Sequence, residues 1–96
     1  MLSTSLGEQS VSIDTNKNLS SDGFKSLIGN AYARRKWKIE HSENDRIIGR
    51  YDRKGIVYKV EAKMGGGLIA LKFLRGYGAK STSYLENLKK DLIAAL

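Results

Sequence analysis

The chain has 96 residues, of which 41% are hydrophobic, carries a net charge of +7 and contains no cysteine. This length fits one domain with a single compact core and leaves little room for a deep enzymatic cleft. The composition excludes disulfides, thiol catalysis, thiolate zinc sites and iron–sulfur clusters, and no apolar run reaches the roughly 18 residues expected of a transmembrane helix.

The N-terminal segment is rich in Ser, Thr, Asn and Gly, and its isolated apolar residues follow no period. We therefore predict a flexible tail over residues 1–18 and a single α+β domain over residues 19–96. A short edge strand at residues 11–14 (VSID) is the alternative. Because the tail is slightly acidic, the positive charge is concentrated in the domain. This distribution favours an anionic partner, such as nucleic acid, phospholipid or an acidic protein, although solubility alone also explains it.

A first helix is predicted to begin after Ser20, which is a good N-cap residue. Asp22 falls in the first turn, where a negative charge is favourable. Phe24, Leu27 and Ile28 recur at helical spacing and indicate the buried side of this helix.

Three cations, Arg34, Arg35 and Lys36, stand at the end of this helix, directly before Trp37, the only tryptophan. Two interpretations remain open. Cations in a last turn complement the exposed carbonyl groups and need no ligand. Alternatively, the run and Lys38 form a rim that binds a phosphate-rich partner.

Four strands are predicted between residues 37 and 74, where apolar side chains recur with a period of two. Loops at residues 43–45, 52–55 and 65–66 keep one apolar face inward in all three hairpins. The predicted opposed pairs are Trp37–Tyr51, Ile39–Gly49, His41–Ile47, Tyr51–Ile56, Gly49–Tyr58, Ile47–Val60, Ala62–Ile69, Val60–Leu71 and Tyr58–Phe73.

A second helix is predicted from the capping-box pattern that starts at Ser83, with Leu85, Leu88 and Leu92 on its apolar side. The elements together predict an α+β fold of order α-β-β-β-β-α. In this fold a four-stranded antiparallel meander has both helices on one face, and its other face is open.

The predicted open face mixes cations with aliphatic side chains, a combination typical of an interaction surface. Its predicted pairs are Lys38–Arg50, Lys59–Lys72 and Val57–Leu74. The aromatic side chains point inward, unlike those of sheets that stack RNA bases on exposed rings, and this counts against single-stranded nucleic acid. The candidate binding residues are Arg34, Arg35, Lys36, Lys38, Arg50, Val57, Lys59, Lys72 and Leu74.

No catalytic or metal-binding constellation is predicted, and no cofactor is expected. His41 is the only histidine, is expected to point inward, and therefore lacks partner ligands for a metal. The carboxylates are expected on different elements and faces, so no acid–base pair is indicated. The glycines at residues 65–67 are interpreted as a hairpin turn. Residues 75–83 (RGYGAKSTS) are a further candidate for anion binding, through backbone amides before the second helix.

The junction from Ala31 to Trp37 (AYARRKW) and the closing SYLENLKKDL resemble small uncharacterised bacterial envelope domains, often made as lipoproteins. This chain has Lys36 where those domains have glycine, and it has no lipid-bearing cysteine. The resemblance implies the cell envelope or periplasm and no catalytic residues. If no leader precedes the chain, the cytoplasm is expected instead.

We therefore predict a monomeric, non-enzymatic module that uses its basic open face to bind an anionic or protein partner. The alternative is a nucleic-acid-binding protein that uses the same face and the rim at residues 34–38. A small hydrolase or transferase is disfavoured, because no nucleophile, base or metal cluster is recognised.

Overall fold

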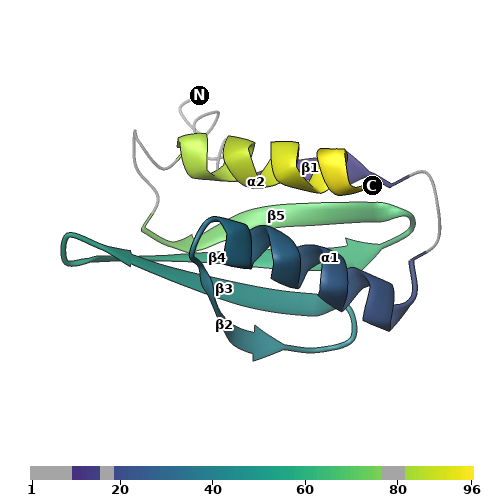
Figure 1. Cartoon of the computed structure of the whole chain (residues 1–96), viewed down its shortest axis with the longest axis horizontal. Coiled ribbons are helices and arrows are strands. Elements are labelled where there is room, and N and C mark those ends of the chain that lie inside the picture. The colour runs from purple at the N-terminus through teal and green to yellow at the C-terminus, as the bar shows by residue number, and fades with distance from the viewer. Residues whose placement is uncertain (1–9, 16–18, 77–81) are drawn as a thin grey trace, which may run out of the picture.

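A computed structural model describes residues 10–15, 19–76 and 82–96. The described residues form two helices and five strands in the chain order β1-α1-β2-β3-β4-β5-α2 (Figure 1). The strands make one antiparallel sheet of order β1-β5-β4-β3-β2. The predicted α+β class is confirmed, whereas the prediction of a four-stranded sheet is wrong, because an additional strand precedes α1.

The additional strand, β1 (Ser10–Asp14), pairs with β5 (Leu68–Arg75) and confirms the alternative of an edge strand. Ile13 opposes Ile69 and is buried in the core. Just after β1, both the backbone N–H and the hydroxyl of Thr15 donate to the Gly67 carbonyl, each at 2.9 Å. Residues 10–15, which the sequence analysis assigned to the tail, are thus part of the domain. Residues 1–9 and 16–18 lie outside the described residues.

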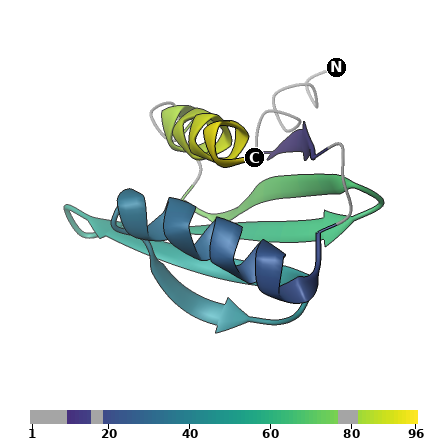
Figure 2. The same cartoon turned by 45° about the vertical axis from the view of Figure 1, so that its right-hand side comes forward.

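The helix α1 (Ser21–Arg34) begins as predicted, because the Ser20 hydroxyl accepts a hydrogen bond of 3.0 Å from the Gly23 N–H. The helix α2 (Thr82–Ala95) lies beside α1, and both helices cover the same face of the sheet (Figures 1 and 2). Both helices bury an apolar side against that face, as the helical spacing predicted. The buried helical residues are Phe24, Ile28, Ala31, Tyr32, Leu85, Leu88 and Leu92.

The sheet contributes the other half of the core from β1, β3 (Arg46–Arg53), β4 (Ile56–Gly65) and β5. Their inward side chains alternate along the strands, as the period of two predicted. The buried residues are Ile13, Ile47, Val60, Ala62, Ile69, Leu71 and Phe73, and Trp37 is buried just before β2 (Lys38–Ser42). No described element covers the opposite face, which we call the open face (Figures 1 and 2). Among the described helices, none is both long and apolar enough to cross a membrane.

Two of the three predicted hairpin registers are wrong by two residues. Tyr51 opposes Tyr58 rather than Ile56, and Ala62 opposes Leu71 rather than Ile69. A shift of two preserves the side chain's face, so the inward and outward assignments survive.

The β3–β4 hairpin is tighter than predicted, whereas the β4–β5 turn has the predicted length but lies one residue later, and each closes through two residues with positive φ. The values are 52° and 81° for Lys54 and Gly55, and 59° and 77° for Gly66 and Gly67. Positive φ at both central residues defines the turn type that matches the twist of paired strands. The turns therefore set the two registers, through a shorter loop between β3 and β4 and a turn displaced by one residue between β4 and β5.

The hairpin between β2 and β3 keeps the predicted Ile39–Gly49 pair, but its strands shift register between Ile39 and His41. Beyond this bulge His41 opposes Ile48 instead of Ile47. The His41 side chain is exposed, and its Nε2 lies 2.6 Å from the Glu43 carboxylate. The prediction that His41 points inward is wrong, because the extra residue reverses the alternation.

A second bulge interrupts the pairing of β4 with β5. Val60 opposes Phe73, but the next pair joins Lys59 to Arg75 and leaves Leu74 without an opposed residue. The predicted Val57–Leu74 pair between β4 and β5 is therefore wrong. The bulge brings Arg75 to the open face beside Lys59.

Candidate anion-binding surface

Four cations form a row across the open face, one from each of four neighbouring strands. Lys38 on β2 opposes Arg50 on β3, which opposes Lys59 on β4, which opposes Arg75 on β5. Neighbouring strands lie about 4.8 Å apart, so this basic row spans about 15 Å. The predicted Lys38–Arg50 pair is confirmed. Opposed like charges destabilise a sheet, and the row therefore needs either compensating acids or a binding role.

The two central cations of the basic row have acidic partners. Arg50 donates to Asp52 at 2.9 Å and lies 3.8 Å from Glu40. Lys59 lies 2.9 Å from the same Glu40 carboxylate, which projects from β2 at the bulge. Glu40 therefore bridges both cations and relieves their repulsion.

The two ends of the basic row differ from its centre. Neither Lys38 nor Arg75 forms an ion pair with a carboxylate among the described residues. Both contribute to the electrostatic lowering of the pKa of Asp52, whose largest cause is the hydrogen bond from Arg50. A single carboxylate thus lies in the field of three cations, and the two ends keep charge available for an anionic partner.

A hollow of about 440 Å³ adjoins the Lys38 end of the basic row, where β3 continues beyond the start of β2. Its lining residues are Lys36, Lys38, Arg50, Tyr51 and Asp52. Lys36 reaches this place because its left-handed backbone, with φ of 66°, turns the chain out of α1. Three cations against one carboxylate make this basic hollow the natural extension of the row.

Lys72 lies on the open face and is separated from the basic row by the pair Val60–Phe73. It opposes Glu61 on β4, so the predicted opposition of Lys59 and Lys72 is wrong. Glu61 also forms an ion pair with Arg46 on β3. Glu61 thus has a cation on each neighbouring strand, Lys72 on β5 and Arg46 on β3.

The predicted rim at residues 34–38 is divided between two sides of the molecule. Arg35 binds Asp91 of α2 through two contacts, Nε to Oδ2 at 2.8 Å and Nη2 to Oδ1 at 3.1 Å. Arg34 borders a depression between α1 and α2 that Asp91 also lines. Arg35 thus joins the two helices and Arg34 lies on the same side of the molecule, whereas Lys36 and Lys38 line the basic hollow.

Of the two predicted aliphatic candidates, Val57 is half-buried and Leu74 is exposed at 44%. Arg75 was not predicted, because strict alternation from Phe73 places it on the buried face. An unpaired cation there would be costly. The conflict between strict alternation and the cost of a buried cation was the one feature of the sequence that indicated the bulge.

Among the described residues, no group of three or more His, Asp or Glu side chains is placed to hold a metal ion. The candidate anion loop at residues 75–83 lies partly outside the described residues, which omit 77–81. No protein-family model matches the chain, and a comparison with curated proteins finds no match. The chemistry of the surface is therefore the basis for assigning a function.

Proposed function

We propose that the protein is a non-enzymatic binding module that holds an anionic partner against its open face. The observation that supports this proposal is the basic row of Lys38, Arg50, Lys59 and Arg75, with the basic hollow at one end. Exposed cations without paired carboxylates at both ends favour an extended anion over a single ion.

Nucleic acid is the alternative partner within this class. Regularly spaced phosphates suit a row of cations. However, Trp37 is only 5% exposed, and the tyrosine rings of the cluster around it lie on the helix side of the sheet. Base stacking on the open face would need rings there. Contacts to phosphates, rather than to bases, are therefore expected if the partner is nucleic acid.

The test compares two double variants that remove the same charge. Lys38→Gln with Arg75→Gln removes both ends of the basic row, whereas Lys89→Gln with Lys90→Gln removes two cations of α2. Binding to duplex DNA, single-stranded RNA and anionic lipid vesicles is measured at several salt concentrations. For DNA, the row variant is expected to lower the log–log salt slope by about 2, and the α2 variant to leave it nearly unchanged.

Two results would overturn the proposal. Equal losses in both double variants would show that net charge, and not the basic row, attracts the probes. Absence of binding to every anionic probe at low salt would remove the anionic partner altogether. Binding to vesicles but not to nucleic acid would support the proposal and reject its nucleic-acid form.

We also propose a location in the bacterial cell envelope, which rests only on the resemblance of the AYARRKW junction and the closing helix. The test is fractionation of bacterial cells that express the full-length gene. Recovery with the membrane or periplasmic fraction is expected, and recovery with the cytoplasm would reject this location.

A further inference from the structure

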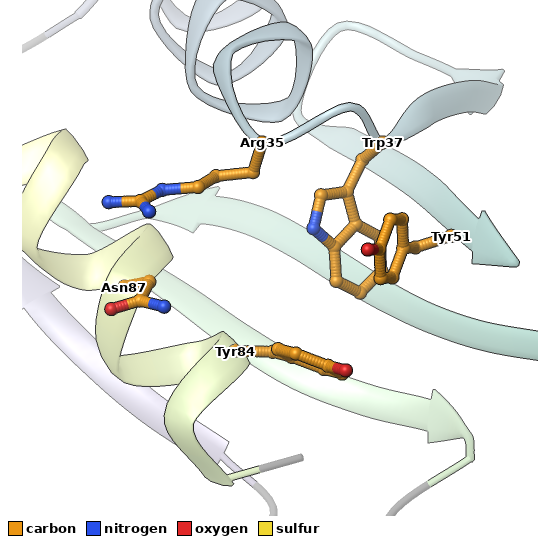
Figure 3. Close-up of a pocket in the computed structure, with 5 residues that line it drawn as sticks. All are labelled: Arg35, Trp37, Tyr51, Tyr84 and Asn87. Atoms are coloured by element: carbon orange, nitrogen blue, oxygen red, sulfur yellow. The ribbon is translucent and has the colours of Figure 1, made fainter. Parts of the chain in front are cut away.

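A small pocket lies on the helix side of the sheet, in the layer opposite to the basic row. Its volume is about 170 Å³. Residues from α2, from β3 and from the junction between α1 and β2 line it, and Figure 3 shows how they surround it. The lining residues are Arg35, Trp37, Tyr51, Tyr84 and Asn87.

Aromatic rings form one wall of this aromatic pocket and fix one another in place. Trp37 stacks on Tyr51 with ring centroids 5.3 Å apart, and Tyr84 meets Trp37 and Tyr51 edge-on at 6.3 and 5.7 Å. Tyr58 adds a further edge contact to Tyr84 at 5.0 Å. Such contacts stabilise the ring orientations, so the wall is already formed without a ligand.

Polar groups border the other side of the aromatic pocket. The indole N–H of Trp37 points toward the side on which Arg35 and Asn87 lie (Figure 3). Arg35 uses its Nε and Nη2 for Asp91, and its Nη1 is not engaged in that pair. Indole and guanidinium groups only donate hydrogen bonds. The pocket thus offers donors to an acceptor-rich group beside an apolar wall.

The charge around the aromatic pocket is positive on balance. Arg35 lines the pocket, and the interaction with Tyr84 raises the pKa of Arg53, so a second guanidinium group lies near Tyr84 although Arg53 does not line the pocket. Asp91 opposes them as the partner of Arg35. A cationic ligand would meet repulsion here, whereas an anionic oxygen would gain charge-assisted hydrogen bonds.

We propose that the aromatic pocket binds a small carboxylate carried on a single planar ring. The carboxylate accepts from Arg35 and the Trp37 indole, and the ring packs against Tyr84. The volume lies below the range of about 300–1,000 Å³ that is usual for drug-sized ligands, so one ring with its carboxylate is the upper size. This site shares Tyr51 with the basic hollow but uses none of the cations proposed to hold the anionic partner.

The test uses benzoate and its uncharged analogue benzamide with the full chain. Trp37 is the only tryptophan, so its fluorescence and its single indole N–H signal in an NMR spectrum report on the pocket directly. Benzoate is expected to shift both signals saturably and to bind about tenfold more tightly than benzamide, because a hydrogen bond to a charged acceptor is stronger.

The variants separate the role of Arg35 from that of charge in general. Arg35→Gln is expected to reduce benzoate binding about tenfold. Arg34→Gln, the matched loss of charge on the preceding residue, is expected to leave it within about twofold. Lys38→Gln with Arg75→Gln, which tests the open face, should leave benzoate binding intact.

Three results would overturn this proposal. The first is that benzoate gives no saturable response. The second is that benzoate and benzamide bind with equal affinity, and the third is that Arg35→Gln retains full binding of benzoate. The first two are measured on the unaltered chain, so they decide the matter even if Arg35→Gln fails to fold.

Discussion

The ring of Tyr32 on α1 lies directly over Gly49 in the middle of β3. A Cβ atom at Gly49 would lie 2.8 Å from Cζ of Tyr32, too close for any real contact. The Tyr32 hydroxyl also donates to the Val60 carbonyl at 2.8 Å, so the ring cannot move without losing a buried hydrogen bond. Burial raises the pKa of Tyr32 well above its ordinary value, which keeps the donor proton in place.

Gly49→Ala is therefore expected to destabilise the protein by about 1–3 kcal/mol through overpacking against Tyr32. Gly29→Ala is the matched control, because the added Cβ in the middle of α1 would meet no atom within 4 Å outside the neighbouring backbone of the helix itself. That change is expected to stabilise by about 0.5–1 kcal/mol. Urea denaturation of both variants measures the two effects, and a neutral Gly49→Ala would contradict the described packing.

A second prediction concerns Lys36, which adopts φ of 66° after the end of α1. A left-handed backbone costs a residue with a Cβ about 1–2 kcal/mol, and glycine avoids this cost. Lys36→Gly is therefore expected to raise the unfolding free energy by about 1 kcal/mol. The same change removes a cation from the basic hollow, so binding of anions should weaken while stability rises. A parallel loss of both would show that Lys36 does not adopt this backbone.

The pH dependence of stability gives a third prediction, through the ion pair between Arg35 and Asp91. Its hydrogen bonds lower the pKa of Asp91 below the ordinary value. A carboxylate with a lowered folded pKa stabilises the fold above its unfolded pKa, about 3.9, and loses this contribution as pH falls through the folded pKa. Wild type is thus expected to exceed Asp91→Asn in stability at about pH 7, with the difference shrinking toward about pH 3. Urea denaturation at both pH values checks this, and a difference independent of pH would contradict it.

A fourth prediction concerns self-association through the open face. Symmetric stacking of two open faces would bring one basic row against the other, and this repulsion is screened only by salt. We expect a monomer at micromolar concentrations in low salt, with association increasing as salt is added. Sedimentation at low and high salt measures this. A tight dimer at low salt would instead make the open face an oligomer interface.

The sequence by itself determined which side chains face the core wherever the strands pair without a bulge. The period of two placed Val60, Leu71 and Phe73 inward, and the structure buries all three. The N-cap at Ser20 was also predicted from the sequence, and the structure shows its hydrogen bond with Gly23. These features are local, because hydrophobic spacing and capping depend on residues a few positions apart.

The pairing of segments distant in sequence was decided only by the tertiary structure. Thr15 and Gly67 are 52 residues apart, and Arg35 and Asp91 are 56 apart. The segment before Thr15 has only Val11 and Ile13 as apolar alternation, too little to favour a strand over a flexible tail without the edge of β5. Backbone groups at that edge supply the hydrogen bonds that the short segment needs.

The candidate site, too, was predicted in part from the sequence and decided in part by the tertiary structure. Lys38, Arg50 and Lys59 were readable as outward cations, because alternation fixes a side chain's face. Their alignment with Arg75 could not be predicted from the sequence, since it depends on tight turns and on a bulge beside Lys59. Registers that differ by two residues satisfy the same hydrophobic pattern. Turn geometry and packing against the helices choose among them, and that choice assembles separate cations into one row.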